Sequence, residues 1–377
     1  MATHKARIET LDGFRCIAIL MVVLYHYYSK WTPPLSPQNY YPYGNALYSY
    51  FQYGYLGVHF FFIISGFVIF YTLEKSATPG SFFFKRLIRL FPPMLVCAAI
   101  TYFVTKVLDP ANNFSPLHSP TALNFLPSLT FTHPIIWIKL LHNNTIYYID
   151  GAYWSLWVEI TFYIISGSIF FYNRGRFIRN WTILLILALI LKLITLPQSI
   201  TALSAYPALY KIANGLSLFA GYLNIFNFII YFTLGILFYC LFFRKKITGF
   251  FLVSCIIFTV AEIWFYPGNG VRLAFLLMIT LFLLFIYKPQ YLSFLKNRFI
   301  ARIGVTSYTI YLIHQNVGVL LINKLSVYTQ SPVLLKMIPV VVIVTAIAFA
   351  ELLYRLYEKP VMKKLTALLV KQPAKIN

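Results

Sequence analysis

The sequence has 377 residues, of which 60% are hydrophobic, 19% are aromatic and only 11% are charged. A soluble domain usually has about a quarter of its residues charged, so this composition excludes an ordinary soluble globular protein. The formal net charge of +22 would suit a nucleic-acid-binding protein, but the basic residues are not distributed as such a protein requires.

Apolar runs of about 20 residues are long enough to cross the hydrocarbon core of a bilayer. The chain contains about ten of them, which predicts an all-α, polytopic transmembrane helix bundle. We expect one transmembrane domain over residues 1–364 and a short basic tail at 365–377. Segment 200–222 is interrupted by Pro207, Lys211 and Gly215 and is predicted to be interfacial or re-entrant. The predicted spans are 14–31, 53–73, 91–107, 152–172, 180–196, 224–243, 248–266, 271–287, 303–324 and 333–357.

Most of the 31 basic residues fall on one side of these spans. Cytoplasmic loops of membrane proteins carry an excess of Lys and Arg, so both termini are predicted to be cytoplasmic. The charge is therefore a topology signal, and no nucleic-acid partner is expected. The basic groups are Lys5, Arg7 and Arg15; Lys75, Lys85, Arg86 and Arg89; Arg174, Arg176 and Arg179; Arg244, Lys245 and Lys246; Lys288, Lys296, Arg298 and Arg302; and Arg355, Lys359, Lys363, Lys364, Lys371 and Lys375.

The first span carries Arg15 at its start and His26 near its end. Eleven helical steps return to within about 20° of the starting direction and rise about 16 Å, so both side chains lie on one face at two depths. An anion held by Arg15 could extend along the helix to His26, and acyl-coenzyme A has that shape. The alternative is a snorkelling arginine and an ordinary interfacial histidine.

Arg86 and Arg89, just before the third span, are three residues apart and share a helical face. Guanidinium groups bind phosphate through paired hydrogen bonds, so this pair is a candidate phosphate site. Positive charge that only sets the topology is the alternative.

In the fourth span, Glu159 lies about 10 Å below the predicted outer surface, with Ser155 one turn away on the same face. A carboxylate at that depth is costly, so it is either functional or a partner for a buried cation. The outer loop before it, 108–151, is too apolar for a solvated linker and too broken for a span. We expect it to form part of an acceptor site or an interfacial segment.

In the ninth span, Ser307, Tyr311 and His314 are spaced to form one polar stripe. His314 is either functional or a histidine hydrogen-bonded within that stripe. The four cysteines lie singly within spans, so neither a disulfide nor a metal site is expected.

Four ionisable side chains from four spans are predicted to lie at one level in the outer half of the bilayer. Counting about 1.5 Å per residue places His26 and His314 about 16–18 Å above the inner face. The same count places Glu159 about 20 Å above the inner face and His59 slightly higher. This convergence predicts a site within the membrane.

Several motifs, in order, resemble those of acyltransferase family 3 of the membrane O-acyltransferases. The resemblance runs from residue 11 to about 364, and the sequence departs from it at His59, where an acidic or amide residue is more common. The motifs are LDGFR…YH (11–26), with the family's R-x10-H spacing, GVHFFFIISGFVI (57–69), FFFKRLIRLFPP (82–93), YWSLWVEITFY (153–163), SYTIYLIHQ (307–315) and LYRLYEKPVMKK (353–364).

The resemblance implies a bacterial inner-membrane enzyme. It would transfer an acyl group, acetyl in most members, from cytoplasmic acyl-coenzyme A to a hydroxyl of an extracytoplasmic or lipid-linked glycan such as O-antigen or exopolysaccharide. Acetyl-coenzyme A is then a donor substrate, and no permanently bound cofactor is expected. The implied roles are donor phosphate binding by Arg15, Arg86 and Arg89, catalysis by His26, Glu159 and His314, and acceptor binding by Trp154, Ser155, Tyr311 and His59. His26 could either deprotonate the acceptor hydroxyl or accept the acyl group itself, and Glu159 could either orient His26 or bind the sugar.

Two other functions fit a bundle with polar residues near the midplane. A transporter would move a glycan or an anion without chemistry, but it gives no reason for the Arg15–His26 spacing. A family member without catalysis would retain only acceptor or regulatory binding. Acceptor-dependent release of coenzyme A separates the enzyme from both.

The alternation of basic loops makes a topology prediction. A reporter that is active only outside the cytoplasm should be active when fused at residue 130 and inactive at 175, at 245 and at the C-terminus. Activity at the C-terminus would require an odd number of spans and would contradict the predicted depths.

Overall fold

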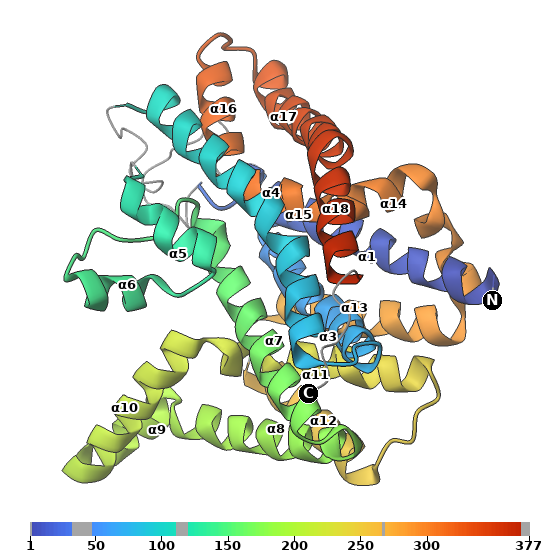
Figure 1. The fold of residues 1–377 in the computed structure, drawn as a ribbon. Coiled ribbons are helices and arrows are strands. Elements are labelled where there is room, and N and C mark those ends of the chain that lie inside the picture. Colours follow the sequence, from blue (N-terminus) through green and yellow to red (C-terminus); the bar gives the residue numbers. More distant parts are fainter. Residues whose placement is uncertain (1, 32–46, 111–119, 266–267, 371–377) are drawn as a thin grey trace. The chain divides into compact units, whose positions relative to one another are not determined.

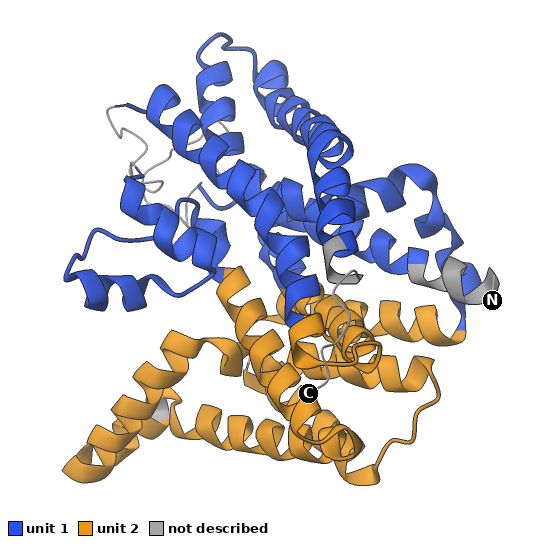
Figure 2. Ribbon diagram, viewed as in Figure 1, with its two compact units in different colours: residues 1–58, 83–154, 288–377 blue, residues 59–82, 155–287 orange. Residues whose placement is uncertain are grey.

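The computed structural model describes residues 2–31, 47–110, 120–265 and 268–370, and every regular element in these ranges is a helix (Figure 1). The all-α prediction is therefore confirmed. The chain divides into two compact units (Figure 2). Unit 1 comprises Met1–Val58, Phe83–Trp154 and Lys288–Asn377, and unit 2 comprises His59–Phe82 and Ser155–Tyr287.

Unit 1 is organised around α1 (Ala2–Tyr28), which packs against segments from the far end of the sequence. These are the 3-10 segment η7 (Pro289–Lys296) and the helices α14, α15 and α16. The other helices that lie wholly or mainly in this unit are α2 (Tyr48–Phe51), η1 (Gly54–Leu56), α4 (Pro79–Leu108), η3 (Ala122–Asn124), α5 (Phe125–Thr130), α6 (Pro134–Leu141), η4 (Gly151–Tyr153), α14 (Arg298–Val305), α15 (Ser307–Ile313), α16 (Asn316–Ser326), α17 (Pro332–Leu353), the π-helical segment η8 (Tyr354–Glu358) and α18 (Lys359–Val370).

Glycines let the chain approach α1 closely. A Cβ on Gly304 of α14 would lie 1.8 Å from the carbonyl oxygen of Asp12, and a Cβ on Gly57 would lie 2.4 Å from that of Ala18. Without a strong hydrophobic force between helices in lipid, such small residues allow the close packing that holds a bundle together. They fix both halves of α1 within unit 1.

Unit 2 has an aromatic core. Phe162 stacks on Phe232 with ring centroids 4.1 Å apart, and Phe238 stacks on Phe282 at 4.7 Å. Trp181 is buried, and its indole N–H donates to Thr233. The helices that lie wholly or mainly in this unit are α3 (Gly57–Glu74), α7 (Trp154–Tyr172), η5 (Arg174–Arg176), α8 (Phe177–Ile194), α9 (Pro197–Ala202), η6 (Leu203–Ala205), α10 (Pro207–Leu223), α11 (Ile225–Phe242), α12 (Gly249–Phe265) and α13 (Asn269–Tyr287).

Eight helices in the described ranges are long and apolar enough to cross a membrane, which confirms the polytopic prediction. They correspond to eight of the ten predicted spans. Helix α12, in the segment predicted as span 248–266, has 17 residues and residue 266 lies outside the described part. The segment predicted as span 303–324 is not one helix, because the chain is interrupted at Thr306 and again at His314–Gln315.

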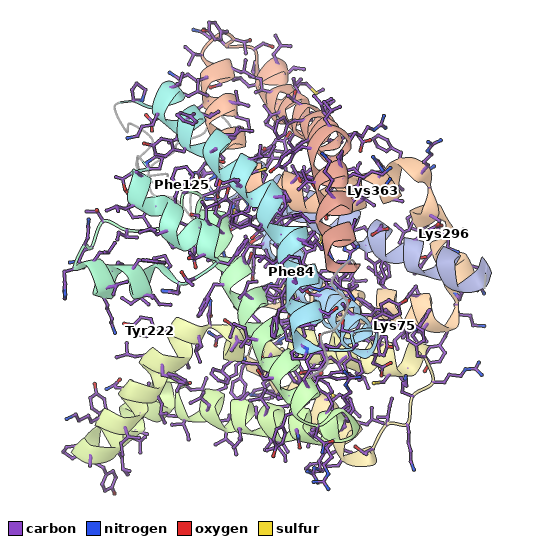
Figure 3. The ribbon with its side chains drawn as sticks, viewed as in Figure 1. Lys75, Phe84, Phe125, Tyr222, Lys296 and Lys363 are labelled. Atoms are coloured by element: carbon purple, nitrogen blue, oxygen red, sulfur yellow. The ribbon has the colours of Figure 1, made fainter. Side chains whose placement is uncertain are left out.

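Within unit 1, the predicted outer loop and a predicted basic inner loop lie far apart. Figure 3 shows Phe125, in α5 of the outer loop, and Lys296, at the end of η7, at opposite ends of this unit. Part of the predicted outer loop (111–119) and of the predicted tail (371–377) lies outside the described residues. Helix α18 continues past residue 364 to Val370.

The crossing of α3 and α11 in unit 2 makes a stability prediction. A Cβ on Gly235 would lie 2.1 Å from the carbonyl oxygen of Ile63, and one on Gly66 would lie 2.1 Å from that of Phe232. Backbone atoms cannot yield, so Gly235→Ala should lower the Tm in detergent, with a cost of about 1–3 kcal/mol. Gly221→Ala in α10 is the matched control, because nothing lies within 4 Å of its added Cβ. Equal Tm values for the two variants would contradict the observed crossing.

Candidate active site

Two histidines 288 residues apart in the sequence meet in unit 1. His26 lies near the end of α1, and His314 follows the last residue of α15 (Figure 1). His314 Nε2 is 3.3 Å from His26 Nδ1, and the ring centroids are 4.7 Å apart with the planes at 82°. The His314 side chain is fully buried, whereas His26 is half-buried. The structure thus brings together two of the three side chains predicted to be catalytic.

The surroundings of the pair assign the protons of the neutral rings. His314 Nδ1 lies 2.6 Å from the carbonyl oxygen of Tyr311, and His26 Nδ1 lies 2.9 Å from that of Val22. A carbonyl only accepts, so Nδ1 must carry the hydrogen in both rings. The Nε2 of His314 then accepts the second, longer contact of the His26 Nδ1–H. The lone pair of His26 is on Nε2.

His314 occupies an interruption in the backbone. In an uninterrupted helix, the N–H of Asn316 would donate to the carbonyl of Leu312. Instead, that N–H donates to Asp150 Oδ2 at 2.9 Å, and the Leu312 carbonyl accepts the hydroxyl of Tyr153 at 2.9 Å. Both halves of the broken helical bond are satisfied by one segment, residues 149–153, which we call the strap.

The strap makes further bonds to the same region. The hydroxyl of Tyr311 donates to the Ala152 carbonyl at 2.8 Å, and the Asn316 side chain donates to the Ile149 carbonyl at 3.0 Å. Asp150 itself is fully buried. The end of the predicted outer loop therefore reaches the level of His314.

Arg15 lies on the same unbroken helix as His26, about 16 Å away along the axis. Its guanidinium is partly exposed and forms an ion pair with Asp12, at 2.5 Å between Nη1 and Oδ1. The α1 helix thus has the polar spacing that the sequence predicts, and Asp12 is a partner that the sequence analysis missed.

Arg86 and Arg89 lie one turn apart on α4, in the part of the helix that belongs to unit 1. Arg86 is buried, whereas Arg89 is exposed. The two guanidinium groups therefore have different surroundings, although they share a helical face.

Glu159, the third predicted catalytic residue, belongs to unit 2. It lies on α7 and is half-buried. One of its oxygens, Oε1, accepts hydrogen bonds from the hydroxyls of Ser65 on α3 and Tyr163 one turn along α7, each at 2.5 Å. Two hydroxyl donors stabilise a carboxylate that lipid would otherwise penalise.

The four predicted acceptor-binding residues divide between the units. His59 is in unit 2, where its ring contacts Tyr231 and Phe228 edge-on at centroid distances of 4.7 and 5.3 Å. Ser155 is buried one turn before Glu159 in the same unit. Trp154 is half-buried and ends a segment of unit 1. Tyr311 is buried in unit 1, with its hydroxyl bound to the strap.

The residues that hold the histidine pair were not predicted from the sequence. Asp150 directly precedes a predicted span, and an aspartate before a glycine is a frequent turn and cap residue. Gln315 and Asn316 extend His314 into a run of three polar residues inside an apolar segment. Such a run is costly in lipid and was the available signal.

The family model described as an acyltransferase domain, that of acyltransferase family 3, matches residues 8–353. The chain belongs to this family. The match confirms the predicted family and the prediction of an acyltransferase. It covers both units, including the two histidines and the strap.

Two relatives are similar to this acyltransferase family 3 chain. The O-acetyltransferase OatA of Staphylococcus aureus is 24% identical over 403 residues, which cover 94% of this chain and 57% of that protein. The O-acetyl transferase of Shigella phage Sf6 is 28% identical over 174 residues, which cover 44% of this chain and 46% of that protein. The chain thus spans little more than half the length of OatA. No solved structure matches it.

The proton assignment is testable by NMR. In protein labelled with ¹⁵N-histidine near neutral pH, His26 and His314 should both be the Nδ1–H tautomer, with unprotonated Nε2 atoms. His133 provides the opposite reference, because its Nδ1 accepts the N–H of Ile135 at 3.2 Å and its proton must be on Nε2. Burial also lowers the pKa of His133, so it stays neutral. A protonated Nε2 on neutral His26 would contradict the arrangement.

Proposed function

We propose that the chain is an integral membrane O-acetyltransferase. It transfers acetyl from acetyl-coenzyme A, bound from the cytoplasmic side, to a hydroxyl of an extracytoplasmic or lipid-linked glycan in a bacterial inner membrane. The observation that carries this proposal is the His26–His314 contact, with the lone pair of His26 on Nε2 and Arg15 on the same helix. The names of the relatives support acetyl as the group.

His26 acts as the general base. Its Nε2 takes the proton of the acceptor hydroxyl while the hydroxyl oxygen attacks the thioester carbonyl. The carbon–sulfur bond then breaks, and the leaving thiolate of coenzyme A takes the proton from the imidazolium. Imidazole suits both steps, because its unperturbed pKa is close to neutral. His26 returns to its starting state at the end of the cycle.

His314 supports this step through its contact with His26. When His26 becomes an imidazolium, its Nδ1–H becomes a stronger donor to His314 Nε2 and to the Val22 carbonyl. The neutral His314 thus holds the ring orientation and spreads the developing charge. A carboxylate has this function in serine hydrolases; here a second histidine supplies the acceptor.

Arg15 is proposed to bind the phosphate end of coenzyme A, which would lie along α1. The pantetheine arm of coenzyme A would follow the helix from the phosphates to the thioester, a distance that suits the spacing of about 16 Å. Arg15 would bind phosphate after exchanging its ion pair with Asp12, since phosphate is the more highly charged partner. Arg86 and Arg89 are proposed to bind the remaining phosphates.

The acceptor side is proposed to involve Glu159, Ser155, Trp154 and His59. Glu159 already accepts two hydroxyl hydrogen bonds, which is the interaction that a sugar hydroxyl offers. Tyr311 is assigned to the support of His314 rather than to the acceptor, because its hydroxyl is bound to the strap.

Purified protein with labelled acetyl-coenzyme A tests the function directly. The enzyme should release free coenzyme A only when an acceptor glycan is present. A transporter, the alternative function, would show glycan-dependent transport in vesicles and no release of coenzyme A. Mass spectrometry of surface glycan from a deletion strain would then identify the acetylated hydroxyl.

The position of the histidine can be tested separately from its presence. The double change Tyr25→His, His26→Tyr moves the imidazole about 100° around α1, away from His314. Composition, charge and hydrophobicity are unchanged, so the variant should insert normally and lose transfer.

Arg15→Ala is the matched comparison, because it should weaken donor binding and raise the KM for acetyl-coenzyme A without removing the base. The measurement is acetyl transfer to glycan at equal expression. Transfer by the shifted variant at a near wild-type rate would exclude His26 as the base.

A further inference from the structure

Asp150 takes no part in the proposed proton transfer, yet it is fully buried beside the residues that do. Its two carboxylate oxygens accept from two different elements. Oδ1 accepts the N–H of Ala152 at 2.8 Å, which caps the 3-10 turn of the strap, and Oδ2 accepts the N–H of Asn316 at 2.9 Å. The carboxylate thus ties the strap to the first residue of α16.

The bonds on either side of His314 restrict where its ring can lie. Asn316, two residues after His314, is held by Asp150, and Leu312, two residues before it, is held by the hydroxyl of Tyr153. The strap also lies close to the interruption, because a Cβ on Gly151 would be 2.7 Å from the side-chain nitrogen of Gln315. His314 therefore lies between two fixed points of the backbone.

The chemistry of these bonds requires a carboxylate. An ionised carboxylate only accepts, and each of its oxygens can face a separate N–H. An asparagine would turn an NH₂ group toward one of the two donors. A serine could cap Ala152 but is too short to reach Asn316 as well. Either change would leave a buried N–H without its acceptor, so the interruption would have to rearrange.

We propose that Asp150 is a positioning residue for the histidine pair. It holds the interruption between α15 and α16 open and so fixes His314 against His26. It acts through His314 and does not touch substrate. The expected effect on catalysis rests on the proposed function, because it assumes that the His26–His314 contact is used in acetyl transfer. The expected effect on the position of His314 does not depend on the proposed function.

The test uses the full-length protein in detergent or nanodiscs. Asp150→Ser should preserve folding, since it keeps the cap on Ala152, and should lower kcat about tenfold or more, as expected for a misplaced catalytic group. Asp150→Asn should give a comparable loss, because its NH₂ group also leaves one of the two N–H groups without an acceptor. The KM for acetyl-coenzyme A should stay within about twofold, because donor binding is at the other end of α1. In parallel, the ¹⁵N resonances of His26 and His314 should shift in Asp150→Ser.

Glu358→Gln is the matched control. Glu358 is a second buried carboxylate of unit 1, bound to the hydroxyl of Thr309 in α15, and glutamine keeps an acceptor there. This variant should leave kcat and both histidine resonances unchanged.

Three results would overturn the proposal. They are unchanged kcat and resonances in Asp150→Ser, lost kcat with unchanged resonances, and a rise in the KM for the acceptor alone, which would make Asp150 a substrate contact. If the wild-type protein transfers no acetyl, the proposed function fails. The positioning role of Asp150 is then tested only by whether the ¹⁵N resonances of His26 and His314 shift in Asp150→Ser.

Discussion

The interruption between α15 and α16 is the constraint on which the arrangement of unit 1 depends. Inside a bilayer no water is present to bind an exposed peptide group, so a broken helix needs protein partners for its free N–H and carbonyl. The strap supplies both, through the carboxylate of Asp150 and the hydroxyl of Tyr153. The ring of His314 lies at this interruption. Its Nε2 faces His26 of α1, and its Nδ1–H donates to the carbonyl of Tyr311.

In the proposed function, Arg15 binds the phosphate end of one long donor substrate, and the histidine contact acts at its thioester end. A single unbroken helix determines the separation of Arg15 and His26, because its rise per residue is fixed. The close approach of Gly304 in α14 to the backbone of α1 holds that helix against the part of the chain that leads to His314. In the proposed function, the rise of α1 between Arg15 and His26 matches the length of the donor, and packing between distant parts of the chain places His26 against His314.

The polar residues of unit 2 have different partners from those of unit 1. Glu159 accepts hydrogen bonds from two hydroxyls, and His59 lies against two aromatic rings. A carboxylate that accepts from hydroxyl groups remains exchangeable with those of a sugar at little electrostatic cost, whereas a buried ion pair would not. This chemistry is consistent with a glycan acceptor.

Hydrophobic run length and charge placement determined the helical class and the polytopic character of the protein, because lipid permits few backbone solutions. The ordered motifs determined the family, and the helical period placed Arg15 and His26 on one face. The tertiary structure alone decided that His26 meets His314 and that the segment 303–324 is interrupted. Helical periodicity describes one segment at a time. The bonds that replace a missing helical hydrogen bond come from Asp150 and Tyr153, more than 150 residues away in sequence, and no local pattern encodes them.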